Sequence, residues 1–308
     1  MNPAVDVSSF VARLEPSEKL RCSGVHHHAG GGGINVARVL KRFDAPALAI
    51  FPVGGAMGTL LKQLVQAEAV PHETIDIAGD TREDFTVSEI ATANQYRFVL
   101  PGPVLMHAEV NKCLEAIRRH LRPQTYVVVS GSLPPGVAED FYATLAREVS
   151  EASAKLVLDT SGPALGAALE HGAFLIKPSR SELSVLARRK LEDADACFAA
   201  ARQIVDSGQA AFVAVSLGKD GAILVGRGCS LRARAPTIQA QTTVGAGDSF
   251  LAALVWSFVH QSTPQEALRL AVAAGSAALL APGTGLCDPD DVRRLKPQVI
   301  VEQIMESA

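Results

Sequence analysis

The sequence predicts an α/β fold whose mostly parallel central sheet is covered by helices on both faces. Its composition is 48% hydrophobic but only 5% aromatic, which suits buried parallel strands rich in Ala, Val and Leu. From about residue 30 onward, short β-branched runs alternate with longer amphipathic segments, as in strand–helix–strand units with right-handed crossovers. Ligands of such sheets bind beyond the carboxyl ends of the strands, so the loops that follow strands are the candidates for a functional site.

Short β-branched runs are predicted to be strands and longer amphipathic runs to be helices, with turn residues between them. The expected strands are Ala47–Val53, Tyr126–Ser130, Lys155–Asp159, Phe174–Lys177, Phe212–Ser216 and Ala222–Val225. The expected helices are Ile34–Phe43, Gly58–Glu68, Ala108–His120, Ala138–Val149, Pro163–His171, Glu182–Ala187, Ala194–Ser207, Asp248–Val259, Pro264–Leu280 and Pro289–Lys296.

Two polar stretches, Val5–Gly24 and Thr81–Val99, break this rhythm because neither has a helical period. Within the second stretch, Phe85–Ile90 and Gln95–Val99 alternate in the manner of half-exposed strands. We interpret residues 5–24 and 81–99 as insertions that form a small antiparallel β-sheet lid on a single domain, residues 1–308.

Charge and cysteine content exclude several classes of protein. The net charge of −3 gives no general attraction to nucleic acid or to a membrane, and the apolar runs 250–259 and 270–281 are too short to span a bilayer. The five cysteines are scattered and never spaced Cys-x-x-Cys, which argues against disulfides or a zinc site. The N-terminus has neither a basic start nor an apolar signal core. We therefore expect a cytoplasmic protein with neither nucleic-acid nor membrane partners.

The most informative motif is Thr242–Ser249, Thr-Thr-Val-Gly-Ala-Gly-Asp-Ser, which runs into the apolar segment 250–259. Gly245 and Gly247 around Ala246 allow a tight turn that brings backbone amides close to a ligand. A buried helix beginning there would offer unpaired N–H groups and its positive dipole end to a phosphate. Asp248 then stands where a phosphate-transfer enzyme needs a base, although an acidic first-turn residue is also ordinary dipole compensation.

A second glycine-rich segment, Gly30–Gly33, precedes Ile34 and Asn35. Four glycines carry an entropic cost, which suggests that a ligand approaches this backbone closely. Asn35 could hydrogen-bond a sugar hydroxyl, or it could lie near the helix cap behind a flexible loop. A dinucleotide site is disfavoured, because no clear strand precedes the glycines.

Three further loops follow predicted strands, and each also has a purely structural interpretation. Ser130–Gly136 offers hydroxyl groups but is also a rigid Pro/Gly turn. Lys177–Glu182 contains Ser179 and Ser181, either of which could cap the next helix. Ser216–Gly221 joins two strands and could be an ordinary hairpin.

Two sets of side chains near the lid need a geometric test. Arg82 and Arg97 would form a bidentate phosphate clamp if they converged on one pocket. His26-His27-His28 invites a metal assignment, but three consecutive side chains cannot all face one site in an extended or helical segment. We expect these histidines to lie in a loop beside the glycine turn.

Taken together, Gly30–Ala37 and Thr242–Ser249 resemble the two signature motifs of the PfkB carbohydrate kinases, which belong to the ribokinase superfamily. Ser-Gly-Ser-Leu-Pro-Pro-Gly, Lys-Pro-x-x-x-Glu and Ser-Leu-Gly-x-x-Gly occur between them in the family's order, so the resemblance covers essentially the whole chain. It implies a ribokinase-like three-layer sandwich with a small β-sheet lid. Within the family, Lys19–Cys22, Gln95–Gly102 and Ala273–Ala278 are most similar to the 6-phosphofructokinase branch.

The resemblance implies Mg²⁺- and ATP-dependent phosphorylation of a hexose phosphate, with fructose 6-phosphate converted to fructose 1,6-bisphosphate. 1-Phosphofructokinase and tagatose-6-phosphate kinase share both main motifs and stay open as alternatives. A non-catalytic sugar-phosphate sensor is a further alternative, disfavoured because a sensor needs no base. The resemblance also implies a homodimer formed through the lids and a K⁺ site.

The resemblance also assigns roles to individual residues. The catalytic set is Asp248 as base, with Gly245, Ala246 and Gly247 as the anion hole. The sugar-phosphate set is Asp6, Gly31, Gly32 and Asn35 around the sugar, with Arg82, Arg97 and Ser132 holding the phosphate. The ATP set is Lys177, Ser179, Ser216, Gly218, Gly221 and, across the dimer, Lys19. The metal set is Glu182, which would hold Mg²⁺ through water, and Thr243, whose backbone would join the turn Ala281–Gly285 around a monovalent cation.

The chain departs from the family pattern at two places. Ser179 stands where the family usually has Asn, and its shorter side chain puts direct contact with a phosphate or a metal-bound water in doubt. Met1 falls where relatives still have residues of a first core strand, so we expect the natural chain to begin further upstream.

Overall fold

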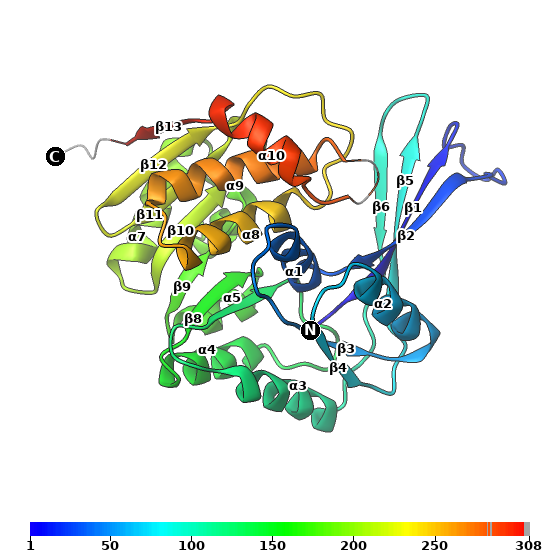
Figure 1. The fold of residues 1–308 in the computed structure, drawn as a ribbon, viewed down its shortest axis with the longest axis horizontal. Helices are drawn as coiled ribbons and strands as arrows, with labels where there is room; N and C mark the ends of the chain where they lie inside the picture. Colours follow the sequence, from blue (N-terminus) through cyan, green and yellow to red (C-terminus); the bar gives the residue numbers. More distant parts are fainter. Residues whose placement is uncertain (282, 284, 305–308) are drawn as a thin grey trace.

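The computed structural model describes residues 1–281, 283 and 285–304, and its largest element is a seven-stranded sheet (Figure 1). The strands follow the order β13-β12-β11-β10-β9-β8-β7. Their bounds are β7 Tyr126–Ser130, β8 Lys155–Asp159, β9 Ala173–Ile176, β10 Ala210–Ser216, β11 Ala222–Gly226, β12 Cys229–Arg234 and β13 Ile300–Gln303. β7 to β10 are parallel, and β10 to β13 are antiparallel. The α/β class is therefore confirmed, with a mixed sheet in which the parallel half lies on the side of β7.

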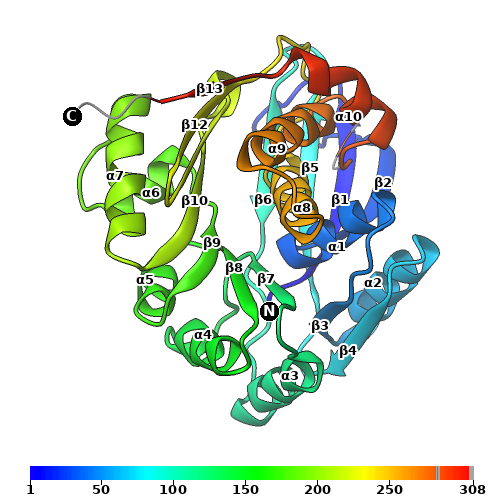
Figure 2. The same ribbon diagram turned by 60° about the vertical axis from the view of Figure 1, so that its left-hand side comes forward.

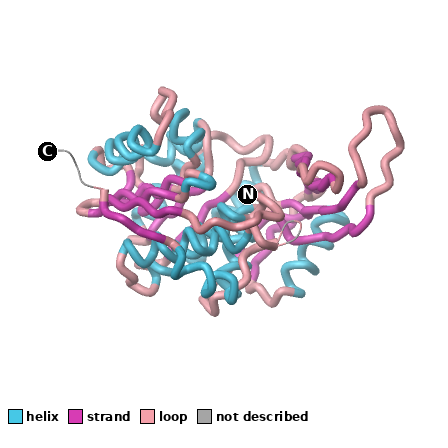
Figure 3. Tube along the Cα trace, turned by 90° about the horizontal axis from the view of Figure 1, so that it is seen from above, coloured by secondary structure: helices cyan, strands magenta, loops and turns pink. Residues whose placement is uncertain are grey.

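Helices cover both faces of this sheet, so the strands form the middle layer (Figure 3). One apolar core joins the sheet to α1 (Gly32–Arg42), α8 (Ala246–Val259), α9 (Pro264–Ala278) and α10 (Pro289–Leu295). The other core joins it to α4 (Phe141–Glu151), α5 (Pro163–Leu169), α6 (Arg180–Leu186) and α7 (Ala194–Asp206). All of the predicted helices are present, although several ends differ by up to three residues.

The lid is a four-stranded sheet of order β2-β1-β5-β6, built from β1 (Ala4–Val11), β2 (Ser23–Gly30), β5 (Arg82–Glu89) and β6 (Gln95–Val99). Its two polar segments were predicted, but the central pair β1–β5 is parallel rather than antiparallel. A parallel pair is allowed here because the chain forms β2, α1, β3, α2 and β4 between β1 and β5, which is long enough for a crossover connection.

Two predictions about the start of the lid are wrong. His26–His28 lie within β2 and not in a loop, so His27 points to the opposite face from its two neighbours. The same strand runs directly into the glycines, where no strand was predicted. The pattern was hidden because β2 is exposed along most of its length and therefore needs few apolar residues.

The predicted strand 47–53 does not join the large sheet. It forms β3 (Ala49–Val53), which pairs only with the parallel β4 (His72–Asp76), a strand that was not predicted. Figure 2 shows this pair beside α2 (Gly55–Ala67) and α3 (His107–His120), near the N-terminus. An apolar cavity of about 630 Å³ is lined by residues of β3, β7 and the helices on both sides, together with Met1.

β12 and β13 were also not predicted, because both are short and carry charged side chains. Across the described part of the chain, none of the helices has the length and apolar character that crossing a bilayer requires.

Candidate active site

The site is centred on the N-terminus of α8, a helix whose apolar sequence is buried between α1 and α9. Gly245 precedes the helix with φ 78°, in the left-handed region that favours glycine. A Cβ at this position would lie 2.8 Å from the carbonyl oxygen of Gly285. The first helical hydrogen bond comes from Ser249 N to Gly245 O, so the N–H groups of Ala246 and Gly247 precede the helical ladder and can face a ligand.

Asp248 lies in this first turn and is only partly exposed. The pKa of its carboxyl group is raised to about 7, mainly by burial and then by the nearby Asp159. Two groups oppose this shift, the side-chain amide of Asn35 and the ammonium group of Lys177. Asn35 Nδ2 donates to Asp248 Oδ2 over 2.9 Å. Asn35, expected at a sugar hydroxyl, is thus bonded to the candidate base itself.

A buried ion pair lies beside Asp248. Lys177 Nζ is 2.9 Å from Asp159 Oδ1, at the ends of two parallel strands, β9 and β8. Burial raises the pKa of Asp159, while Lys177 opposes that shift. The ammonium group also lies near the glycine turn, because a Cβ on Gly247 would be 3.5 Å from Lys177 Nζ. Asp159 was missed as a site residue, although its place at the end of a predicted parallel strand was a usable signal.

Ser179 and Glu182 form a capping box at the start of α6, the structural alternative that the sequence left open. Glu182 N donates to Ser179 Oγ over 3.3 Å, and Ser179 N donates to Glu182 Oε2 over 2.7 Å. The Glu182 carboxylate nevertheless acts electrostatically on both Asp159 and Lys177. Its Oε1 atom is therefore a candidate ligand for a metal ion or its water.

The loop Ser216–Gly221 joins β10 and β11 as an antiparallel hairpin. Ser216 N donates to Pro178 O over 3.1 Å, which brings this loop against the segment that contains Ser179. Gly218 and Gly221 have φ values of 62° and 95°. A Cβ on Gly218 would meet no atom within 4 Å, so its backbone faces open space.

One face of the lid gathers four charged side chains. Asp6 on β1 pairs with Asp84 on β5, while Arg82 and Arg97 lie on the same face by strand alternation and register. Burial raises the pKa of Asp6 to about 6 and Asp84 adds to the shift, whereas Arg97, Arg38 and Arg82 oppose it. Asp6 in turn acts on Asp248, so this face of the lid adjoins the α8 turn.

Arg82 is the best-connected residue of the lid face. Its guanidinium donates to Leu100 O over 2.8 Å and to Asn2 O over 3.2 Å, and lies 3.5 Å from Asp84 Oδ1. Its Nε is buried and has no hydrogen-bond partner among the described residues, which leaves a donor for an anion. Asn2 Nδ2 donates to Ser132 Oγ over 3.2 Å, so Asn2 contacts two of the three residues expected to hold the phosphate, Arg82 and Ser132.

The glycine segment lies between the lid and the large sheet. Gly31 precedes α1 with φ 104°, and a Cβ on Gly32 would lie 2.1 Å from Ser130 Oγ. Ser130 Oγ donates to Asp159 Oδ2 over 3.2 Å. Only glycine allows α1 to begin this close to β7, so the segment serves packing at the site as well as any approach of a ligand.

Two expected residues are not gathered with the others. Lys19 is exposed in the connection between β1 and β2, at the far end of the lid from the large sheet (Figure 1). Thr243 is also exposed, and the turn Ala281–Gly285 includes Pro282 and Thr284, which lie outside the described residues. The part of the chain that the structure describes contains no group of three or more His, Cys, Asp or Glu side chains able to hold a metal ion.

The glycine-built helix N-terminus suits a phosphate, the carboxyl group beside it can accept a proton, and the arginines of the lid suit an anionic substrate. The family model described as pfkB family carbohydrate kinase matches residues 2–291. The ATP-dependent 6-phosphofructokinase isozyme 2 of Mycobacterium tuberculosis is 44% identical over 294 residues, covering 96% of this chain and 86% of that protein. The protein of the same name from Escherichia coli is 39% identical over 294 residues, covering 95% of each chain.

The crystal structure of phosphofructokinase-2 from Escherichia coli in complex with potassium superimposes with a TM-score of 0.93. It is 38% identical, and the match covers 97% of this chain and 96% of that one. The chain belongs to the pfkB family of carbohydrate kinases.

Proposed function

We propose that the protein transfers the γ-phosphoryl group of ATP to fructose 6-phosphate, giving fructose 1,6-bisphosphate. The observation that carries this proposal is the juxtaposition of Asp248, at the N-terminus of α8, with the lid face that bears Asp6, Arg82 and Arg97. The first element suits transfer to an alcohol, and the second suits an alcohol that already carries a phosphate.

In the proposed reaction, Asp248 orients the primary hydroxyl of the sugar and accepts its proton as the new O–P bond forms. Enzymatic phosphoryl transfer depends mostly on positioning and charge stabilisation, so a base is needed only late in the step. The N–H groups of the Gly245–Gly247 turn would stabilise the equatorial oxygens of the transferred phosphoryl group.

The lid would select a phosphorylated sugar. Arg82 and Arg97, with Ser132, would hold the sugar phosphate, and Asp6 would accept hydrogen bonds from sugar hydroxyls beside Gly31 and Gly32. The unpaired Nε of Arg82 supports this assignment, because a buried donor without a partner costs free energy until a ligand accepts from it. Unphosphorylated fructose would leave that donor unpaired.

The nucleotide would lie along the ends of β9 and β10, against Ser216, Gly218 and Gly221. Lys177 would contact the phosphates, and Ser179 would act through the cap that holds Glu182. Mg²⁺, when bound with ATP, would neutralise phosphate charge through ligation by one or two carboxylates, water and phosphate oxygens. Asp159 and Glu182 fit that donor set, because both are carboxylates beside Lys177. Thr243 and the adjoining turn are the candidate residues for K⁺.

We further propose that two copies pair through their lids. The face of the lid opposite Asp6 and Asp84 carries Val7, Phe85, Tyr96 and Phe98 by strand alternation. Phe98 is 51% exposed and Tyr96 38%, which is unusual for aromatic side chains on a strand unless another surface covers them. In such a dimer, Lys19 could reach the partner's nucleotide. Phe98→Asp should convert dimer to monomer in light scattering, and a monomeric parent protein would contradict this part.

One assay separates the competing functions. ADP release would be measured with fructose 6-phosphate, fructose 1-phosphate and tagatose 6-phosphate at equal concentration, with fructose as the unphosphorylated control. We expect the highest kcat/KM for fructose 6-phosphate and the lowest for fructose. A preference for fructose 1-phosphate or tagatose 6-phosphate would assign one of the alternative kinases. Binding of sugar phosphate without ADP release would indicate a sensor.

A further inference from the structure

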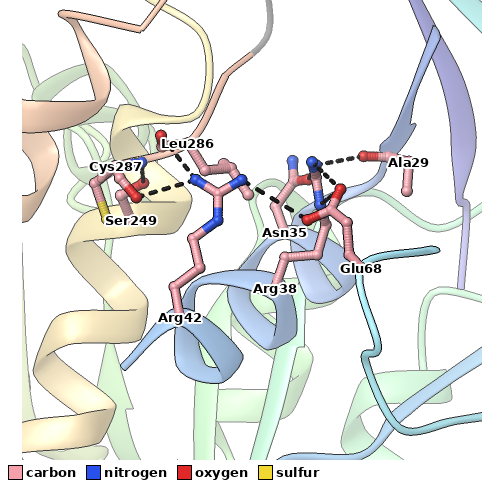
Figure 4. Close-up of polar contacts among 8 residues, drawn as sticks. All are labelled: Ala29, Asn35, Arg38, Arg42, Glu68, Ser249, Leu286 and Cys287. Atoms are coloured by element: carbon pink, nitrogen blue, oxygen red, sulfur yellow. Dashed lines mark hydrogen bonds and ion pairs between the residues drawn. The ribbon is translucent and has the colours of Figure 1, made fainter. Parts of the chain in front are cut away.

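A buried arginine, Arg38, holds the side chain of Asn35 (Figure 4), whose amide nitrogen donates to Asp248. Arg38 is 3% exposed and stands three residues after Asn35 on α1, so the two side chains share one face of the helix. Its Nη1 atom donates to Asn35 Oδ1 over 3.0 Å and to Ala29 O, the residue before the glycines, over 2.7 Å. Its Nε donates to Glu68 Oε1 over 2.9 Å. The charge is thus compensated although it is buried.

The chemistry of these three side chains fixes the orientation of the amide between them. An arginine side chain can only donate hydrogen bonds, and an ionised carboxylate can only accept them. An amide placed between the two must therefore present its oxygen to Arg38 and its nitrogen to Asp248. The reversed amide would place an NH₂ group against a guanidinium and a carbonyl oxygen against a carboxylate, so both contacts would be repulsive.

We propose that Arg38 is a positioning residue, which holds the Asn35 amide in the one orientation that donates to Asp248. The inference rests on the proposed role of Asp248 as the base. Glu68, from the end of α2, completes the arrangement by holding the guanidinium on its other side. The set therefore links α2, the lid strand β2 and α1 to the N-terminus of α8.

This arrangement has a consequence for protonation. The bond donated by Asn35 lowers the pKa of Asp248, as does Lys177, while Asp159 and Asp6 raise it. A reversed amide could accept a bond from the protonated form of Asp248, and Arg38 makes that orientation unfavourable. Arg38 therefore favours the ionised base without touching it. Loss of Arg38 should raise the pKa of Asp248, because the amide is then free to turn.

The chain offers a matched control one turn further along α1. Arg42 shares Glu68 with Arg38, at 3.7 Å from Oε2. Its Nη1 atom donates to Leu286 O and Cys287 O, each over 3.0 Å, and so serves the turn beside Ser249 rather than the Asn35 amide (Figure 4). Arg42 has the same side chain, helix and carboxylate partner as Arg38, and differs in the group that it orients.

The test compares the pH dependence of kcat/KM for parent, Arg38→Met, Arg38→Lys and Arg42→Met proteins. We expect Arg38→Met to shift the fall of kcat/KM at acidic pH (the acidic limb) upward by about one pH unit and to lower kcat at pH 7 about fivefold. The KM for ATP should change by less than about twofold, because the nucleotide loop is untouched. Arg38→Lys should restore part of the loss, since an ammonium group also only donates. Arg42→Met should leave the limb in place.

A double-mutant cycle with Asn35→Ala shows whether Arg38 acts through the amide. We expect the combined Arg38→Met and Asn35→Ala variant to have the same acidic limb as Asn35→Ala alone. Additive shifts, or an unmoved limb in Arg38→Met, would overturn the proposal. If Arg38→Met does not fold, as judged by circular dichroism, the same cycle is run with Arg38→Lys. Normal turnover in Asp248→Asn would contradict the proposed role of Asp248 as the base. A defect in Asp248→Asn without a shift of the acidic limb in Arg38→Met would contradict only the role proposed for Arg38.

Discussion

The carboxyl groups at the α8 turn and those on the lid meet at one site but lie in different surroundings. At the α8 turn, Asp248 has a pKa raised to about 7 and is held by a neutral amide. On the lid, Asp6 and Asp84 share a face with Arg82 and Arg97. The lid also has a carboxyl group with a raised pKa, Asp6 at about 6, but two arginines lie on the same face as Asp6, whereas Asp248 is bonded to a neutral amide. If Asp248 is the base and the lid arginines hold the sugar phosphate, as proposed, substitutions at the α8 turn should mainly change kcat and substitutions on the lid should mainly change KM.

The largest effect should come from the α8 turn. Asp248→Asn keeps the shape and the helix N-terminus but removes the base, so kcat should fall by about 10²–10⁴-fold. Titration calorimetry should show that ATP still binds. The control is Asp76→Asn, which changes an exposed carboxyl group on β4 and should leave kcat unchanged. Near-normal turnover in Asp248→Asn would remove the difference between the two regions.

A substitution on the lid should raise KM and leave kcat nearly unchanged, in contrast to Asp248→Asn. Arg97→Ala removes a charged donor from the sugar-phosphate side, so the KM for fructose 6-phosphate should rise by about 10–100-fold while kcat changes little. Arg234→Ala, an exposed arginine on β12, is the matched control. If the substitution lowered kcat and left KM unchanged, the lid would belong to the chemistry and the comparison would fail.

The dependence of kcat/KM on pH should reflect the protonation of Asp248 at the α8 turn. Burial is the main reason that the pKa of Asp248 is raised to about 7, so the carboxyl group is mostly protonated below pH 7. A protonated carboxyl group cannot accept a proton from the sugar. kcat/KM should therefore fall by about tenfold per pH unit below that value. The residual activity of Asp248→Asn should lack this part of the limb. A limb that persists unchanged in that variant would assign it to another group.

The smallest effect concerns the glycine that makes the turn. Gly245→Ala forces a side chain into a left-handed backbone and against Gly285 O, which should lower the free energy of unfolding by about 1–3 kcal/mol. Gly208 has the same φ of 78° but open space around it, so Gly208→Ala measures the backbone strain alone. Urea denaturation should rank Gly245→Ala below Gly208→Ala. Equal stabilities would mean that the close approach of Gly285 is unimportant.

The elements and loops that could be predicted from the sequence are those with a clear local pattern of apolar residues. The apolar run after Asp248 could only be a buried helix, and strand ends correctly located Lys177 and Ser216. Sequence reasoning failed where partners are distant in the chain. The bond from Asn35 to Asp248, the pairing of Lys177 with Asp159 and the contact of Asn2 with Ser132 all join separate elements. It also missed β2, which is exposed along most of its length, and β4, whose sequence His-Glu-Thr-Ile-Asp contains one apolar residue; neither strand has the apolar period that identifies the others.

The bond between Asn35 and Asp248 spans 213 positions of the chain, and the bonds from Arg42 to Leu286 and Cys287 span 244 and 245. During synthesis at about 5–20 residues per second, Asp248 emerges roughly 10–40 s after Asn35. By then the four strands of the lid and six of the seven strands of the large sheet have already been synthesised. The contact between Asn35 and Asp248 can therefore form only after most of the large sheet has been synthesised.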